Sequence, residues 1–187
     1  MELPARPVGR LCDDADMSAI TDYFSAPSDE AAAAALDDLL DLDPDDIAAT
    51  EELYRVSPDE ATRPRVRTAA SGTPVLQAKG IDPKVSLGQL EAVLTGRSYD
   101  DVKTGPRRGS MVADSVDGDA FVLSVADELR TALAASDPSA LIAAAREWIF
   151  DEDAEPSEES VPFVVALAEL ASIAASRGER LYCRIIV

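Results

Sequence analysis

Residues 178–187 of the chain read Gly-Glu-Arg-Leu-Tyr-Cys-Arg-Ile-Ile-Val, and this closing stretch decides the fold. The aromatic and β-branched side chains of residues 181–187 are typical of a strand. A strand at the end of a sequence needs a pairing partner, and the apolar segment over residues 20–24 is the natural candidate. We therefore expect these two segments, distant in the sequence, to pair in one sheet.

Helix signals fill most of the sequence between the two expected strands. Ser28, Asp43 and Asp137 are N-cap residue types followed by acidic residues or proline in the first turn. Gly96 and Gly178 follow apolar stripes, where glycine commonly ends a helix. These signals predict helices over residues 28–41, 44–55, 84–95, 125–135, 138–149 and 158–177.

The remaining segments contain turn signals. Residues 111–124 predict a hairpin with Asp117-Gly118 at its turn, and Ser124 with Asp127 resembles a capping box. Residues 75–78 predict a short extended segment. Residues 57–74 are rich in Ser, Pro, Thr, Gly and Arg without apolar periodicity, which predicts a long, mobile loop.

The predicted architecture is α+β, mostly helical, with a small sheet joining the N- and C-terminal strands. The chain has 187 residues, 47% of them hydrophobic, which suits one domain with its own core. We expect that domain over residues 17–187. Met17 is a second possible start, and we expect residues 1–16 to be a disordered extension.

The composition excludes several classes of catalytic site. The chain contains neither histidine nor asparagine, so an ordinary Ser-His-Asp triad cannot form. Nucleotide-binding glycine motifs and the G-x-S-x-G pattern are missing too. The two cysteines, Cys12 and Cys183, form no CxxC motif, which favours a reducing cytoplasm. We expect no enzyme activity, no cofactor and no metal, and Trp148 and Cys183 to be core residues.

The net charge of −19 is unevenly distributed along the chain. Residues 1–60 carry −14, residues 61–110 carry +5 and residues 111–187 carry −10. The basic part has two foci, at residues 63–67 and residues 103–108. We expect both foci to neutralise acidic groups of the same molecule, with phosphate or nucleic-acid contact as the alternative. Nucleic acid and anionic membranes are disfavoured as partners because so negative a chain repels polyanions. Apolar runs also fall short of the roughly 18 residues of a membrane span.

The acidic stretch over residues 37–52 is the strongest candidate surface. Acidic surfaces speed association with basic proteins and can mimic a polyanion. The sequence therefore favours a non-enzymatic binding protein of the bacterial cytoplasm, an inhibitor or immunity-type protein that covers a basic partner such as a nuclease toxin. Two alternatives stay open: an acidity that reflects only solubility, in a structural or interaction module, and a carboxylate-only enzyme site with a divalent ion. The candidate partner-binding residues are Asp37, Asp38, Asp41, Asp43, Asp45, Asp46, Glu51 and Glu52.

The carboxylate spacing of this stretch also resembles a calcium loop. Asp41, Asp43, Asp45 and Glu52 stand at relative positions one, three, five and twelve. The sixth position is Asp46, however, where the loop requires glycine. An acidic helix N-terminus explains the same residues, and we favour it.

Three segments together resemble the uncharacterised bacterial YfbM-like family. They are residues 80–96, which begin Gly-Ile-Asp-Pro-Lys and end Leu-Thr-Gly, the helix pair around Asp137-Pro138 and Trp148, and the long helix ending Arg-Gly-Glu-Arg at residues 177–180. The resemblance implies an α+β fold. It implies no particular activity, because none is established for the family. Relatives carry Trp and His in the first of these helices. Residues 86–91 contain neither, so a site built on them would be absent here.

Overall fold

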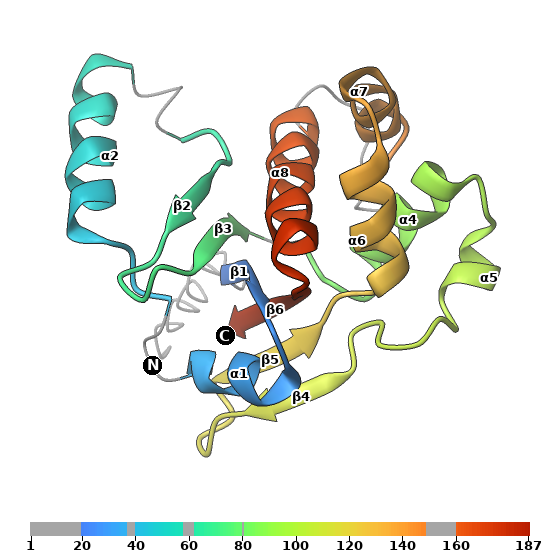
Figure 1. Cartoon of the computed structure of the whole chain (residues 1–187), viewed down its shortest axis with the longest axis horizontal. Coiled ribbons are helices and arrows are strands. Elements are labelled where there is room, and N and C mark those ends of the chain that lie inside the picture. Colours follow the sequence, from blue (N-terminus) through green and yellow to red (C-terminus); the bar gives the residue numbers. More distant parts are fainter. Residues whose placement is uncertain (1–19, 37–39, 58–61, 80, 149–159) are drawn as a thin grey trace, which may run out of the picture.

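A six-stranded antiparallel sheet forms the centre of the molecule (Figure 1). The computed structural model describes residues 20–36, 40–57, 62–79, 81–148 and 160–187. The strand order is β2-β3-β1-β6-β5-β4. The strands are β1 (Ile20–Ala26), β2 (Val66–Thr68), β3 (Pro74–Lys79), β4 (Met111–Asp114), β5 (Ala120–Ser124) and β6 (Arg180–Ile186).

The predicted pairing of the first and last strands is confirmed. β1 and β6 lie side by side in the middle of the sheet, with Tyr23 opposite Cys183 and Phe24 opposite Tyr182. Because successive side chains of a strand point to opposite faces, Tyr23 and Cys183 enter one core cluster and Phe24 and Tyr182 enter another. Both faces of the central strands are therefore covered.

Most of the helices lie on one face of the sheet. In Figure 1, α8 packs along the sheet with α4, α6 and α7 around it, while α1 lies on the opposite side. Among the described residues, no helix has the length and apolar character that crossing a membrane requires. The helices are α1 (Asp29–Ala33), the 3-10 turn η1 (Ala34–Leu36), α2 (Pro44–Val56), α4 (Ser86–Thr95), α5 (Tyr99–Val102), α6 (Asp127–Ala135), α7 (Pro138–Glu147) and α8 (Val161–Arg177).

Large side chains fill the space between these helices and the sheet. Trp148 stacks on Phe163 with ring centroids 5.8 Å apart, and its indole N–H donates to the carbonyl of Ser86. Tyr23 meets the same Phe163 edge-on and donates its hydroxyl to the carbonyl of Ile81. These buried polar atoms are satisfied, so the aromatic rings can pack without a desolvation penalty. The prediction that Trp148 and Cys183 belong to the core is confirmed.

The helix boundaries follow most of the predicted caps. Ser28, Asp43 and Asp137 each accept a hydrogen bond from a backbone N–H of the following turn. Gly96 and Gly178 adopt φ of 65° and 67°, the left-handed conformation that ends α4 and α8. Local capping chemistry therefore determined these ends as the sequence predicted.

The predicted capping box at Ser124 and Asp127 is wrong. Ser124 belongs to β5, and its hydroxyl donates to the backbone carbonyls of Arg107 and Ser110. Ala126 is the N-cap of α6 and offers no side-chain bond. Ser124 is unavailable as a cap because it ends the predicted hairpin, where β5 pairs with β6 up to Ser124.

Two further predictions need correction. Residues 57–74 are not one long loop, because Val66–Thr68 forms β2 at the sheet edge and Pro74 begins β3. The helix predicted over residues 28–41 is shorter: α1 ends at Ala33 and a 3-10 turn follows to Leu36. The predicted extension, residues 1–16, lies outside the described residues.

Candidate functional site

Helix α2, which carries half of the predicted partner-binding residues, projects from the body of the molecule (Figure 1). Backbone contacts join its base to the edge of the sheet: Leu42 bridges to Ala69, and the N–H of Asp43 donates to the carbonyl of Thr68. None of the described side chains of α2 is fully buried. The helix therefore presents nearly its whole circumference to solvent.

Three of the predicted carboxylates support the structure of α2. Asp43 caps the helix by accepting the N–H of Asp45 at 2.8 Å, and Asp46 accepts the N–H of Thr68 on β2 at 2.6 Å. Glu52 pairs with Arg55 one turn later at 2.8 Å. The helix N-terminus interpretation is thus confirmed for Asp43, and these three side chains have structural contacts as well as charge.

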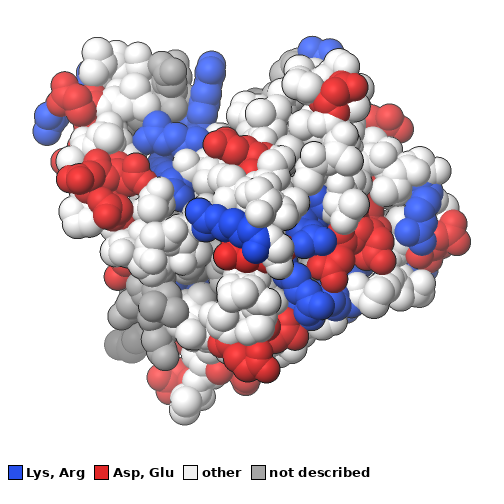
Figure 2. All heavy atoms as spheres, in the orientation of Figure 1, with Lys and Arg blue, Asp and Glu red and all other residues white. Residues whose placement is uncertain are grey.

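The other predicted carboxylates are free where they can be described. Asp41, Asp45 and Glu51 are exposed, and no described donor reaches their side-chain oxygens. Asp37 and Asp38 lie outside the described residues. Figure 2 shows acidic side chains over the outer side of α2. The structure therefore brings the free carboxylates to a projecting helix rather than to an enclosed site.

The calcium-like spacing does not form a loop. Pro44 is the first residue of α2, so Asp43 is its cap and Glu52 lies within the helix. Among the residues that the structure describes, no group of three or more metal-ligating side chains converges. These residues therefore form the N-terminus of a helix and not a calcium-binding loop.

An apolar hollow of about 580 Å³ lies beside the free carboxylates of α2. Leu42, Ile47 and Thr50 line it together with Glu51, Arg55 and Arg67. Ile47 is 45% exposed, and Val56 at the end of the same helix is 72% exposed. Apolar side chains left open to solvent and surrounded by charges are typical of surfaces that contact other proteins.

The second basic focus, residues 103–108, turns inward as predicted. Arg107 forms a two-pronged contact with Asp29 at 2.9 and 3.1 Å, and its guanidinium lies over the ring of Tyr182. Hydrogen bonds from Arg107 and Tyr182 hold the pKa of Asp29 below its usual value. Burial, with the bond to Asp29, raises the pKa of Tyr182 to about 12. This focus therefore joins α1 to the sheet.

Arg108 enters the interior directly beneath this contact. Its Nη2 lies 2.5 Å from Oε2 of Glu91, and the two side chains are 2% and 1% exposed. Its Nε donates to the carbonyl of Val102. Arg108 and Tyr99 pack closely against Gly88, so a Cβ atom there would require these side chains to shift slightly. The neutralisation expected for this focus is confirmed.

The first basic focus behaves differently. Arg63, Arg65 and Arg67 form no ion pair with any carboxylate in the part of the chain that the structure describes. Arg65 instead donates to the hydroxyl of Thr50 on α2 at 2.8 Å. Figure 2 shows basic side chains gathered beside α2, over the side that faces the body of the molecule. Among the described residues, the neutralisation expected for this focus is limited to the attraction between Asp46 and Arg67.

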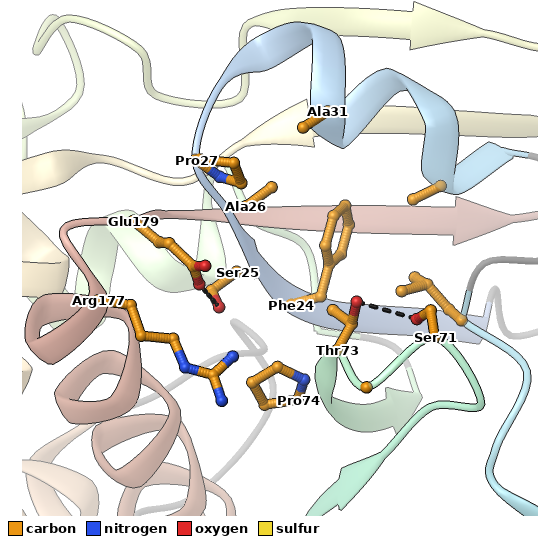
Figure 3. A pocket seen from close by; sticks show the side chains of 13 residues that line it. Phe24, Ser25, Ala26, Pro27, Ala31, Ser71, Thr73, Pro74, Arg177 and Glu179 are labelled. Carbon is orange, nitrogen blue, oxygen red and sulfur yellow. Dashed lines mark hydrogen bonds between the residues drawn. The ribbon is translucent and has the colours of Figure 1, made fainter.

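A second hollow, of about 280 Å³, opens between the end of β1, α1, the turn before β3 and the C-terminal end of α8 (Figure 3). Phe24 and Leu40 are among its apolar walls. Ser25 donates to Glu179 at 2.5 Å, and Arg177 reaches from the end of α8 toward Pro74 in the figure. A carboxylate is a much weaker base than the imidazole that activates serine in hydrolases, so this arrangement favours binding over catalysis. Sequence reasoning missed the hollow because its residues come from four separate segments without a common motif.

Comparison of the chain with protein-family models, curated proteins and solved structures finds no match. The argument for function therefore depends on the residues and geometry described above.

Proposed function

We propose that this chain is a non-enzymatic acidic binding protein of the cytoplasm that covers a basic protein partner, such as a toxin. The observation that carries the proposal is the projecting helix α2 with two exposed, unbonded carboxylates, Asp45 and Glu51, and a third, Asp41, just before the helix. Charges held away from the body of a protein act at long range and steer an oppositely charged partner. The likeness to inhibitor and immunity proteins is one of electrostatics alone.

The apolar hollow beside these carboxylates supports the same proposal. Stable interfaces combine a desolvated apolar centre with a polar rim. Ile47 and Leu42 supply apolar surface in the hollow, and Glu51 lies on its edge. A basic partner would thus be steered by the carboxylates and held by an apolar side chain inserted between α2 and β2.

Two alternative functions make different use of the same charge. If the acidity serves only solubility, the position of each carboxylate should be unimportant and only the net charge should matter. An enzyme site built from carboxylates and a divalent ion would need converging ligands. The described residues contain no such group, and the exposed acids of α2 point outward from a helix. Only the proposal of a basic protein partner requires that charges on α2 affect binding more than equal charges elsewhere on the surface.

The test compares two charge reversals of equal size. Asp45→Lys with Glu51→Lys changes α2, and Asp114→Lys with Asp117→Lys changes the β4–β5 hairpin by the same charge; all four side chains are exposed. Immobilised full-length protein captures basic proteins from lysate at low ionic strength, and association and dissociation rates are then measured for each captured protein. We expect the α2 reversal to slow association on the order of tenfold, with a smaller effect on dissociation, because peripheral charges act mainly on the on-rate.

The hairpin variant is the matched control and should associate nearly as fast as the wild type. Binding should also weaken as salt rises, since charges separated by more than about 8 Å are screened at physiological ionic strength. The proposal is rejected if no basic protein is retained. Equal sensitivity to the two reversals would also reject it, in favour of an acidity that serves solubility.

A further inference from the structure

We infer that the hollow lined by Arg63, Arg65 and Arg67 is a binding site for a small ligand bearing an oligophosphate group. The hollow measures about 530 Å³ and lies along the edge strand β2. Its other lining residues include Gln77 and Ala78 of β3. The inference does not depend on the proposed protein partner, because it concerns a ligand of opposite charge; the two hollows adjoin and share Arg67.

The charge balance of the chain makes this hollow exceptional. Acidic residues outnumber basic ones by 36 to 17 in the chain, yet none of the described residues that line the hollow carries a carboxylate. Elsewhere, Arg107, Arg108 and Arg184 each lie within 3 Å of a carboxylate oxygen. Among the described residues, Arg63, Arg65 and Arg67 thus lie together without a carboxylate partner, and we expect an external anion to bind between them.

The strand geometry explains why the three side chains share one hollow. Arg65 and Arg67 are two residues apart, so they point to the same face of the chain, about 6.6 Å apart at their Cα atoms. Val66 between them points to the other face and packs against the main core. Pairing of β2 with β3 fixes the backbone at Arg67, and the bond to Thr50 holds the side chain of Arg65. Part of the donor set is thus held in position before any ligand arrives.

Among the described acidic residues near these arginines, Glu51 lines the adjoining hollow with Arg67, and Asp46 is already engaged. Asp46 on α2 attracts Arg67, but its Oδ2 accepts the backbone N–H of Thr68. Burial and the neighbouring charge of Arg65 lower the pKa of Arg67. Like charges therefore repel across the hollow, and an anion placed between them would relieve that repulsion.

The composition of the lining selects the class of anion. Guanidinium groups match phosphate oxygens with two parallel hydrogen bonds, and the Gln77 side chain offers a further neutral donor. Three positive charges in so small a volume suit several negative charges on one compact ligand, which a single carboxylate cannot supply. None of the described residues that line the hollow is aromatic, so they provide no stacking for nucleic-acid bases, and the net charge of −19 repels long polyanions. A pyrophosphate or triphosphate group, free or esterified, fits these conditions.

The experiment measures binding of defined phosphates to the full-length protein by isothermal titration calorimetry in low-salt buffer without divalent ions. The probes are inorganic phosphate, pyrophosphate, triphosphate and adenosine triphosphate. We expect one saturable site whose affinity rises from phosphate to triphosphate. Equal affinity for triphosphate and adenosine triphosphate would identify the phosphate chain as the recognised group, and tighter binding of the nucleotide would identify a phosphate ester as the source.

Matched variants test the location of the site. Arg67→Gln and Arg63→Gln should each weaken triphosphate binding about tenfold, the value of one lost charge-assisted bond. Arg55→Gln removes an equal charge from α2, where Arg55 pairs with Glu52 outside the hollow, and should leave the affinity within about twofold. Thr50→Val removes the bond that anchors Arg65 without changing any charge, and should weaken binding less than Arg67→Gln.

Circular dichroism of each variant confirms that the fold is retained before titration. The inference is overturned if triphosphate binds the wild type and the Arg63→Gln, Arg67→Gln double variant equally. It is also overturned if hexaglutamate binds the hollow as tightly as triphosphate does, because the site would then recognise an acidic peptide. Absence of any saturable binding by the wild type would overturn it as well.

Discussion

At the scale of single residues, the buried ion pair of Arg108 and Glu91 is the feature of the fold with the greatest desolvation cost to offset. Two charges are removed from water and lie 2.5 Å apart at almost zero exposure. The cost of removing an ion from water is large, so each charge depends on its partner for compensation. Arg108 also holds the 103–108 segment against α4 through the carbonyl of Val102.

Loss of one partner should therefore be costly. Glu91→Gln leaves the guanidinium buried without a counter-charge and should lower the free energy of unfolding by about 3 to 5 kcal/mol. Urea unfolding followed by circular dichroism measures the change. The double variant Glu91→Leu with Arg108→Met should recover most of the loss, and Asp100→Asn, in the exposed pair with Lys103, should cost far less. A Glu91→Gln variant as stable as the wild type would show that water reaches the pair.

At the scale of elements, α2 is attached differently from the other helices. Helices α4, α6, α7 and α8 bury apolar side chains, whereas the described part of α2 buries none fully. Its attachment depends on polar bonds, from Thr68 to Asp46 and from Arg65 to Thr50. A helix held in this way should open locally at low free-energy cost.

Asp46→Ala tests this attachment. Loss of the bond to the Thr68 N–H removes about 1 kcal/mol from the local stability, so hydrogen exchange of the α2 amides should accelerate about fivefold. Exchange of the α8 amides should stay unchanged, because α8 is held by the apolar core. Glu51→Ala removes the same charge from α2 without a hydrogen bond and serves as the control. Equal acceleration in both variants would mean that charge, and not the bond, positions the helix.

Prediction from the sequence succeeded where local chemistry decides an element. The caps at Ser28, Asp43 and Asp137 and the pairing of the terminal strands follow from residue type and apolar pattern. The hairpin over residues 111–124 was predicted with its turn, where Gly118 adopts φ of 72°. Such features depend on a few neighbouring residues, which the sequence shows directly.

Prediction failed where distant segments decide the outcome. β2 carries an arginine on its solvent-facing side, so its sequence lacks a clear apolar pattern. Only its pairing with β3 identifies it as a strand. The sequence showed two similar basic foci, but one turns inward to Asp29 and Glu91 while the other lines an open hollow. The choice between neutralisation and exposure depends on which carboxylates the fold brings near, and spacing along the chain carries no such information.

At the scale of the whole molecule, the proposed protein-binding site is acidic and the proposed phosphate-binding site is basic. The two sites lie on different sides of the part of the molecule that contains α2 and β2. The outer side of α2 carries free carboxylates, and basic side chains gather on the side facing the body of the molecule, where Arg63, Arg65 and Arg67 line a hollow (Figure 2). Ion pairs among the described residues are few compared with the 36 acidic residues, and two of them, Arg55 with Glu52 and Lys103 with Asp100, are exposed. Most of the negative charge is therefore uncompensated and should oppose the compact state by self-repulsion.

This self-repulsion predicts how stability responds to salt. Raising ionic strength from about 0.01 M to 1 M shortens the screening length from about 30 Å to 3 Å, so repulsion between separated surface carboxylates should vanish and the melting temperature should rise. Calorimetry in sodium chloride measures the trend. Neutralising four exposed carboxylates, by Asp45→Asn, Glu51→Gln, Asp114→Asn and Asp117→Asn, should raise the melting temperature at low salt and flatten its salt dependence. If the melting temperature instead falls as salt rises, attractive ion pairs such as Arg107 with Asp29 dominate the electrostatic stability, since salt weakens attraction between exposed charges just as it weakens repulsion.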